Sequence, residues 1–102
     1  MQHIGMVLQD ERGQVIEKSD LNFVDIIATL LEYKDTDSYP LLRSVDPYGD
    51  TIFNIHQISS VIQELDHFAS EAMGKRLAEA IKKIIEFMSK AEQHTYIRLV
   101  GD

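Results

Sequence analysis

Hydrophobic residues recur along this chain at two different spacings. Over 23–31 they occupy positions i, i+3, i+4, i+7 and i+8, which is the period of a helix that lies on a core. The same period returns over 55–68 and over 77–88. The segment 94–100 instead alternates at period two, as a half-buried strand does. The pattern therefore predicts three helices and a C-terminal strand.

A β-hairpin is predicted near the N-terminus. The runs 6–8 and 14–16 flank the polar residues 10–13, and Gly13 can adopt the positive φ that closes such a loop. The segment 94–100 is rich in residues that favour strands, so we expect it to pair beside this hairpin. One face of that strand is expected to carry Thr95, Ile97 and Leu99.

The segment 39–54 predicts several short elements. Pro40 favours extended geometry at the residue before it, and we expect a strand at 41–45. Residues 46–50, Asp-Pro-Tyr-Gly-Asp, have the composition of a tight turn in which the glycine tolerates a left-handed conformation. A short strand at 51–53 should follow.

Polar residues mark the expected starts of the helices. Ser19 and Asp20 can cap the first helix. Asn54, with Gln57 three residues later, predicts a capping box for the second. The second and third helical patterns fit either one kinked helix or an antiparallel helical hairpin. The short connection between them favours the hairpin.

The resulting order is β-β-α-β-(β)-α-α-β. Strands and helices do not alternate strictly, which argues against a purely parallel sheet. We expect a single α+β domain over residues 1–102, with a mostly antiparallel sheet of about four strands and about three helices on one face. A chain of 102 residues can bury one core without a metal or a disulfide.

Composition narrows the possible functions. The absence of cysteine excludes disulfides, thiolate zinc sites and cysteine nucleophiles. The net charge is −7, and residues 1–70 alone hold twelve acidic and four basic residues, a balance of −8. This charge argues against nucleic acid as a partner and permits a basic protein partner. The alternative is that the acidic residues only keep a small domain soluble.

No feature of the sequence suggests a membrane or an export signal. The N-terminus lacks a basic region followed by an apolar run. The longest apolar stretch, 23–31, is interrupted by Asp25 and Thr29 and is too short to cross a bilayer. We therefore expect a soluble cytoplasmic protein without membrane association.

The central segment also carries a resemblance. The residues Tyr39-Pro-Leu-Leu-Arg-x-Val-Asp-Pro-Tyr-Gly-Asp-Thr-x-Phe-Asn54, with the ending Ile97-Arg-Leu-Val-Gly-Asp102, resemble a group of small bacterial single-domain proteins to which no function is attached. The likeness covers about a quarter of the chain. It implies a bacterial or phage origin, and it implies no catalytic residue.

Candidate metal ligands are present but incomplete. Asp46 and Asp50 lack the further carboxylates and the terminal glutamate of a calcium loop. His56 and His67 would stand about 16 Å apart along one helix and cannot share a metal. Glu64 and His67 form one Glu-x-x-His motif, whereas di-iron bundles need two. We expect no metal and no cofactor.

Catalytic motifs are also missing. No serine lies in a Gly-x-Ser-x-Gly motif, and the five glycines are too scattered to cradle a phosphate. These absences favour a non-enzymatic role. The alternative is an enzyme whose catalytic residues are far apart in sequence and come together only in the folded structure.

Acidic residues and tyrosines concentrate between residues 33 and 50. Tyrosines beside carboxylates suit a recognition surface for a basic protein. Alternatively, one or two tyrosines roof the core while the acids solvate a loop. The residues expected to contact a partner are Asp35, Asp37, Tyr39, Arg43, Asp46, Tyr48 and Asp50.

Three functional hypotheses follow. The first is a non-enzymatic interaction domain with an acidic surface, such as an immunity-type or antitoxin-type inhibitor of a basic protein. The second is a small enzyme or ligand binder with a site around Tyr48, Asp50 and His56. The third is a structural homodimer formed through a sheet edge or through the helix pair.

Overall fold

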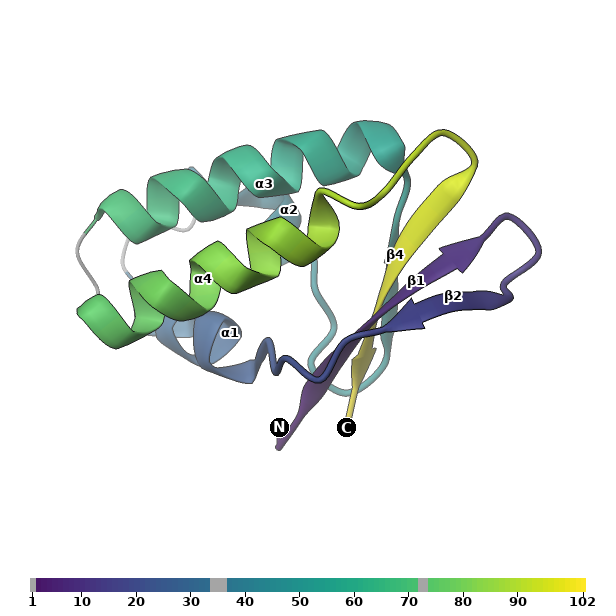
Figure 1. Cartoon of the computed structure of the whole chain (residues 1–102). Helices are drawn as coiled ribbons and strands as arrows, with labels where there is room; N and C mark the ends of the chain where they lie inside the picture. Colours follow the sequence, from purple (N-terminus) through teal and green to yellow (C-terminus); the bar gives the residue numbers. More distant parts are fainter. Residues whose placement is uncertain (1, 34–36, 72–73) are drawn as a thin grey trace.

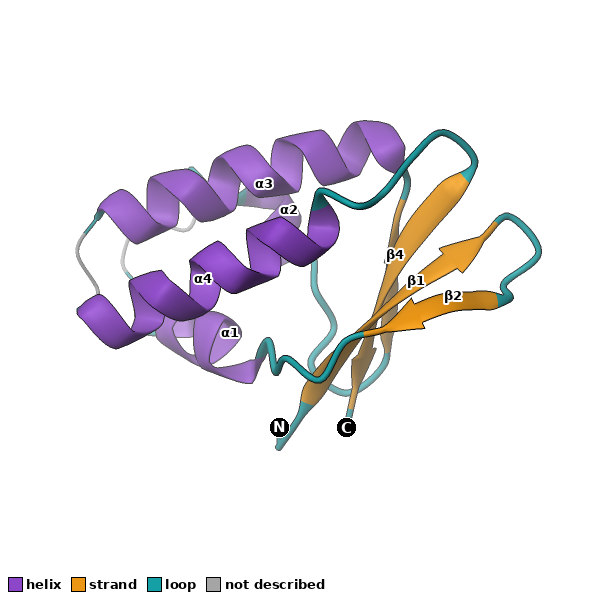
Figure 2. Cartoon of the chain, in the orientation of Figure 1, coloured by secondary structure: helices purple, strands orange, loops and turns teal. Residues whose placement is uncertain are grey.

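Four strands form one antiparallel sheet, and the helices pack on one of its faces (Figure 1, Figure 2). The computed structural model describes residues 2–33, 37–71 and 74–102. The elements are β1 (Ile4–Asp10), β2 (Val15–Lys18), α1 (Val24–Leu31), α2 (Pro40–Arg43), β3 (Asp50–Phe53), α3 (Ile55–Ser70), α4 (Lys75–Met88) and β4 (Thr95–Gly101). This arrangement confirms the predicted α+β class and the antiparallel sheet.

The two long strands form the centre of the sheet. The strand order is β2-β1-β4-β3, so β2 and β3 are the edges. β4 pairs with β1 along its full length, from Ile4 opposite Gly101 to Asp10 opposite Thr95. This pairing confirms that the C-terminal strand lies beside the first hairpin, whose loop contains Gly13 at φ 84°.

Alternation along the central strands gives the sheet an inner and an outer face. Ile97 and Leu99 share one face, as the period-two pattern predicts, and both are fully buried in the core. The neighbouring β1 contributes Ile4, Met6 and Leu8 to the same core. We call the opposite side, which no described helix covers, the outer face (Figure 1).

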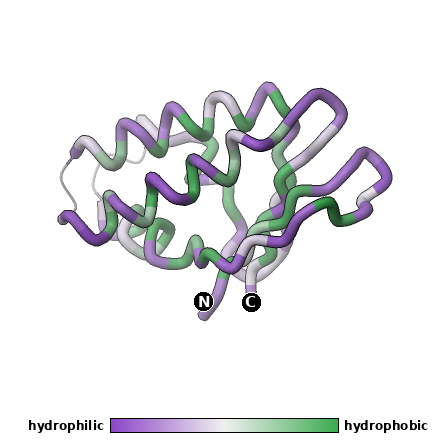
Figure 3. The backbone as a smooth tube through the Cα atoms, viewed as in Figure 1, coloured by the Kyte–Doolittle hydropathy of each residue, from purple (hydrophilic) through white to green (hydrophobic). Residues whose placement is uncertain are grey.

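The two long helices form an antiparallel hairpin above the sheet, which confirms the favoured alternative (Figure 1). Asn54 caps α3: its side chain accepts a hydrogen bond from the N–H of Gln57 at 2.9 Å, and the side-chain oxygen of Gln57 accepts one from the N–H of Asn54 at 3.0 Å. Figure 3 shows hydrophobic and hydrophilic positions alternating along both helices. The buried residues of the pair are Ile58, Val61, Leu65, Phe68, Ile81, Ile84, Phe87 and Met88.

The predicted strand at 41–45 is wrong. Its first three residues belong instead to the short helix α2. Pro40 is the first residue of α2, a position where its missing N–H costs nothing. The N–H groups of Leu41 and Leu42 donate to the carboxylate of Glu64 on α3. A partner more than twenty residues away therefore stabilises a helix that local sequence does not predict.

The predicted cap at Ser19 and Asp20 is also wrong. α1 begins only at Val24, and the Oδ1 atom of Asn22 accepts its N–H at 3.0 Å. The same oxygen accepts the N–H of Ile4 at 3.0 Å. Asn22 thus joins the start of α1 to the start of β1. The helix therefore begins at Val24, later in the sequence than a cap at Ser19 or Asp20 would place it.

Candidate functional site

Two of the predicted partner residues pair with each other. Asp37 accepts a hydrogen bond from Arg43 at 2.8 Å, and both side chains are exposed. An exposed ion pair of this kind contributes little to stability, about 0–1 kcal/mol. Asp35 lies outside the described residues. Arg43 therefore has a local structural partner in Asp37.

Tyr39 belongs to the core rather than to a surface. Its exposed fraction is 0%. Its ring meets Phe68 edge-to-face with centroids 5.1 Å apart, and its hydroxyl donates to Glu71 at 3.3 Å. Tyr39 is thus one of the tyrosines that roof the core, and it cannot touch a partner in this conformation.

The turn that carries Tyr48 is held by its own polar groups. The Oδ1 atom of Asp46 accepts the N–H of Tyr48 at 2.9 Å. The hydroxyl of Thr51 accepts the N–H of Asp46 at 2.9 Å. Gly49 has no positive φ, contrary to expectation; instead, a Cβ atom there would lie 2.6 Å from the Asp46 carboxylate. A side chain at position 49 would therefore force the Asp46 carboxylate to shift.

The same turn is anchored on the last strand. Gly101 donates its N–H to the carbonyl of Gly49 at 2.8 Å. A Cβ atom at Gly101 would lie 2.5 Å from the carbonyl carbon and oxygen of Pro47. The turn and the end of β4 thus pack backbone against backbone, and neither can shift without the other.

Four exposed residues follow one another along this turn and β3: Asp46, Tyr48, Asp50 and Ile52, which we call the Tyr48 surface. Tyr48 is 69% exposed and Ile52 is 51% exposed. Asp50 and Ile52 pair with Val100 and Arg98, so both lie on the outer face. Tyr48 is the most exposed large hydrophobic residue among those described.

The edge of β3 adds backbone groups to this surface. Bonded and non-bonded residues alternate along an antiparallel pair. Because Gly49 is bonded to Gly101, the N–H and C=O groups of Asp50 and Ile52 are directed to the free side of β3. The surface therefore offers an aromatic ring, two carboxylates, an aliphatic side chain and unpaired strand edge groups.

A second polar cluster lies at the end of α3. The carboxylate of Glu71 accepts hydrogen bonds from the hydroxyls of Tyr33 and Tyr39, and it lies 2.9 Å from Nε2 of His67. The pKa of Glu71 lies below its ordinary value. The largest cause is the hydrogen bond from the Tyr33 hydroxyl, and the Tyr39 hydroxyl and the nearby His67 lower the pKa further. Sequence reasoning missed this cluster, because Tyr33 and Glu71 are 38 residues apart.

The site expected around Tyr48, Asp50 and His56 is not gathered in the hollow beside His56. A hollow of about 270 Å³ does lie beside His56, and its walls come from residues 54–56 and 93–96. Tyr48 and Asp50 are not among them. The exposed turn and His56 therefore do not share this hollow.

Within residues 2–33, 37–71 and 74–102, no three acidic or histidine side chains lie together in a way that could hold a metal ion. No helix of the same residues is long and apolar enough to cross a membrane. Comparison with protein-family models, with curated proteins and with solved structures finds no match to this chain.

Proposed function

We propose that this chain is a non-enzymatic protein-interaction domain that binds a basic protein through the Tyr48 surface. Within that class, the proposal is an immunity-type or antitoxin-type inhibitor in the bacterial cytoplasm. The observation that carries it is the exposure of Tyr48, at 69%, on a turn that hydrogen bonds hold in place. An exposed tyrosine on a fixed turn is the kind of residue that a pocket of a partner protein can receive.

The rigidity of the turn supports a binding role. Ordering a loop or a side chain on binding costs about 0.5–1.5 kcal/mol for each mobile side chain. The backbone around Tyr48 is already held by Asp46, Thr51 and Gly101, so binding need not order the backbone of this turn. Tyrosine is also among the residues that dominate binding energy when a partner pocket receives them.

Charge supports a basic partner. Asp46 and Asp50 lie on either side of Tyr48, and the residues up to 70 carry a balance of −8. Complementary charge raises association rates and suppresses wrong partners more than it raises affinity. The free edge of β3 offers a further route, because a partner strand can pair with an exposed sheet edge.

A capture experiment tests this proposal. The wild-type chain is immobilised and exposed to an extract of the source organism at low and at high salt, and bound proteins are identified by mass spectrometry. We expect one basic protein that is lost at high salt, since screening weakens exposed charge pairs. Tyr48→Ala and Asp50→Lys should each abolish its capture.

The matched control is Asp66→Lys, which makes the same charge reversal at an exposed position on α3. Capture of the basic protein should survive this change. The proposal fails if no basic protein is recovered, or if Asp66→Lys reduces capture as much as Asp50→Lys does. Recovery of the chain itself as the sole bound protein would replace it with the homodimer hypothesis.

A further inference from the structure

The outer face of the sheet contains a groove whose charge is opposite to that of the molecule as a whole. The groove has a volume of about 450 Å³ and lies over β1, β2 and β4. Its basic residues are His3, Lys18 and Arg98, whereas Asp102 is the acidic residue among its walls. Such a concentration of basic groups stands out in a chain of net charge −7.

Strand register places two of these cations in one row. Val7 pairs with Lys18 on β2 and with Arg98 on β4, so the row reads lysine, valine, arginine across three strands. The two cationic residues are therefore separated by two strand spacings, about 10 Å. An anion placed above Val7 would have a cation on each side.

A glycine creates the hollow beside this row. Gly5 pairs with Val100, and alternation puts it on the outer face with Val7. A Cβ atom at Gly5 would lie 3.3 Å from the ring of His3 and would take up part of the groove that Gly5 lines. Glycine inside a strand weakens the strand, and it often marks a place where a ligand approaches the backbone closely.

Arg98 has donors to offer. Its side chain is 33% exposed, and its closest carboxylate, that of Asp50, lies 3.8 Å away, beyond hydrogen-bond distance. Its Nε atom has no hydrogen-bond partner among the described residues but is itself buried, so a ligand would meet the exposed part of the side chain. A guanidinium carries five N–H donors in a planar fork that matches a carboxylate. The surrounding walls are apolar, with Val7, Val15 and Val100.

We propose that this groove binds a small molecule in which a carboxylate is joined to an apolar chain. The carboxylate lies between Lys18 and Arg98, and the apolar chain lies over Gly5 and against the valines. This site is separate from the Tyr48 surface, and it takes a ligand of opposite charge to the basic protein proposed there.

Octanoate is the probe for this site, and binding is followed by amide shifts in two-dimensional NMR of the intact chain. We expect the amides of Gly5, Val7 and Val100 to shift and saturate with a Kd on the order of 1 mM, as suits a ligand of this size in an open groove. Octylamine carries the same chain with a positive charge, and at equal concentration it should leave these amides unshifted.

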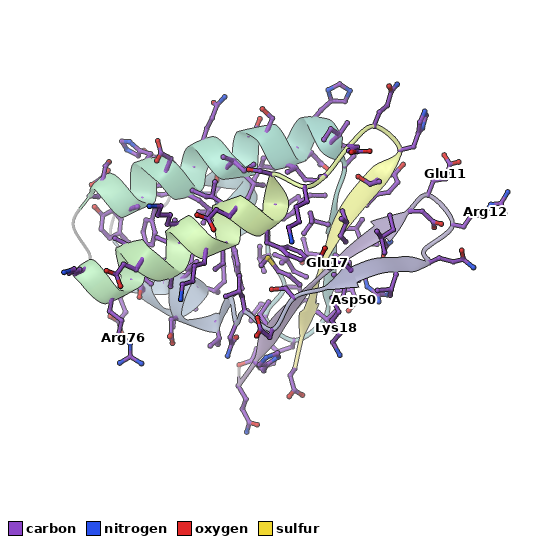
Figure 4. All side chains as sticks on the ribbon, in the orientation of Figure 1. Glu11, Arg12, Glu17, Lys18, Asp50 and Arg76 are labelled. Carbon is purple, nitrogen blue, oxygen red and sulfur yellow. The ribbon has the colours of Figure 1, made fainter. Side chains whose placement is uncertain are left out.

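Two kinds of variant locate the binding. Arg98→Gln should raise the Kd for octanoate about tenfold, the usual effect of losing a hydrogen bond to a charged group. Gly5→Ala should also weaken binding, because its methyl group occupies the hollow. The matched control is Arg76→Gln, at the start of α4 and at the end of the molecule away from the sheet (Figure 4); it should leave the Kd unchanged.

The proposal is overturned if octanoate does not shift these amides, or if octylamine shifts them equally. It is also overturned if Arg98→Gln binds octanoate as Arg76→Gln does. Should Arg98→Gln fail to fold, Lys18→Gln and Gly5→Ala carry the same test, because β2 is an exposed edge and Gly5 meets only a flexible side chain. None of these readouts depends on a protein partner, so the result stands apart from the capture experiment.

Discussion

The Oε1 atom of Glu64 lies 3.0 Å from the backbone nitrogen of Leu42 and joins α3 to the first turn of α2. Both carboxylate oxygens also lie 3.1 Å from the nitrogen of Leu41. The first N–H groups of a helix have no partner within it, and a carboxylate there also interacts favourably with the helix dipole. Glu64 thus serves as a cap that comes from another helix.

Removing this cap should destabilise the fold. Glu64→Ala leaves the two N–H groups of α2 without an acceptor, and we expect a loss of about 1.5–3 kcal/mol in the free energy of unfolding. Urea denaturation at neutral pH measures it. Gln63→Ala, at the exposed neighbouring position, is the control and should change stability by no more than about 0.5 kcal/mol. Equal losses in the two variants would contradict the capping role.

Truncation of Tyr39 should reduce the stability of the fold strongly, whereas truncation of Tyr48 should hardly change it. Tyr39 is fully buried, so Tyr39→Ala removes a packed ring and should cost about 3–5 kcal/mol. Tyr48 is exposed, so Tyr48→Ala should change stability by less than about 0.5 kcal/mol. Thermal unfolding of both variants measures the difference. A large loss at Tyr48 would mean that its ring supports the fold, and would remove it as a free binding residue.

The Glu71 cluster predicts a pH dependence. Because the folded-state pKa of Glu71 lies below its ordinary value of 4.5, the carboxylate stabilises the fold at pH values above 4.5. This contribution is lost as the pH falls through the lowered folded-state pKa. Glu71→Gln should therefore be less stable than the wild type at neutral pH, and the difference should shrink toward zero in acid.

The largest cause of that lowered pKa can be tested directly. Tyr33→Phe removes the hydroxyl that donates to Glu71, and the pKa of Glu71 should rise toward its ordinary value. NMR titration of the side-chain carboxyl carbon follows the change. Tyr96→Phe, which makes the same substitution on β4, should leave the pKa of Glu71 in place. An unchanged pKa in Tyr33→Phe would assign the effect to Tyr39 and His67 instead.

Two glycines on neighbouring strands should tolerate alanine very differently. Gly101→Ala forces a methyl group against the backbone of Pro47 at 2.5 Å, and we expect a loss of about 1–3 kcal/mol from overpacking. Gly5→Ala meets only the side chain of His3 at 3.3 Å, which can move. Its effect on stability should be smaller, as chemical denaturation of the two variants would show. Similar losses of stability in the two variants would argue against close packing of the turn against Gly101.

The outer face is divided between two kinds of charge. The Tyr48 surface contributes Asp50, and the groove contributes Arg98, with 3.8 Å between their charged groups. A pair at this separation on a partly exposed face interacts weakly. Asp50 and Arg98 can therefore each turn to a ligand without a large loss of stability.

Patterns within one element were readable from the sequence because their causes are local. The capping box needs only Asn54 and Gln57, three residues apart, and the structure forms it as predicted. The alternation over 94–100 places Ile97 and Leu99 on one face of β4, and the structure buries that face. The helical periods over 55–68 and 77–88 likewise identify the faces that α3 and α4 bury.

Tertiary structure decided the features that depend on distant residues. Whether residues 40–43 form a helix depends on Glu64, and whether Tyr39 is buried depends on Phe68 and Glu71. The basic groove exists because strand pairing sets Lys18 and Arg98 on either side of Val7. The sequence by itself determines periods, caps and turns, since these arise from neighbours along the chain. Pairings across the fold depend on the packing of whole elements, and no short stretch of sequence contains that information.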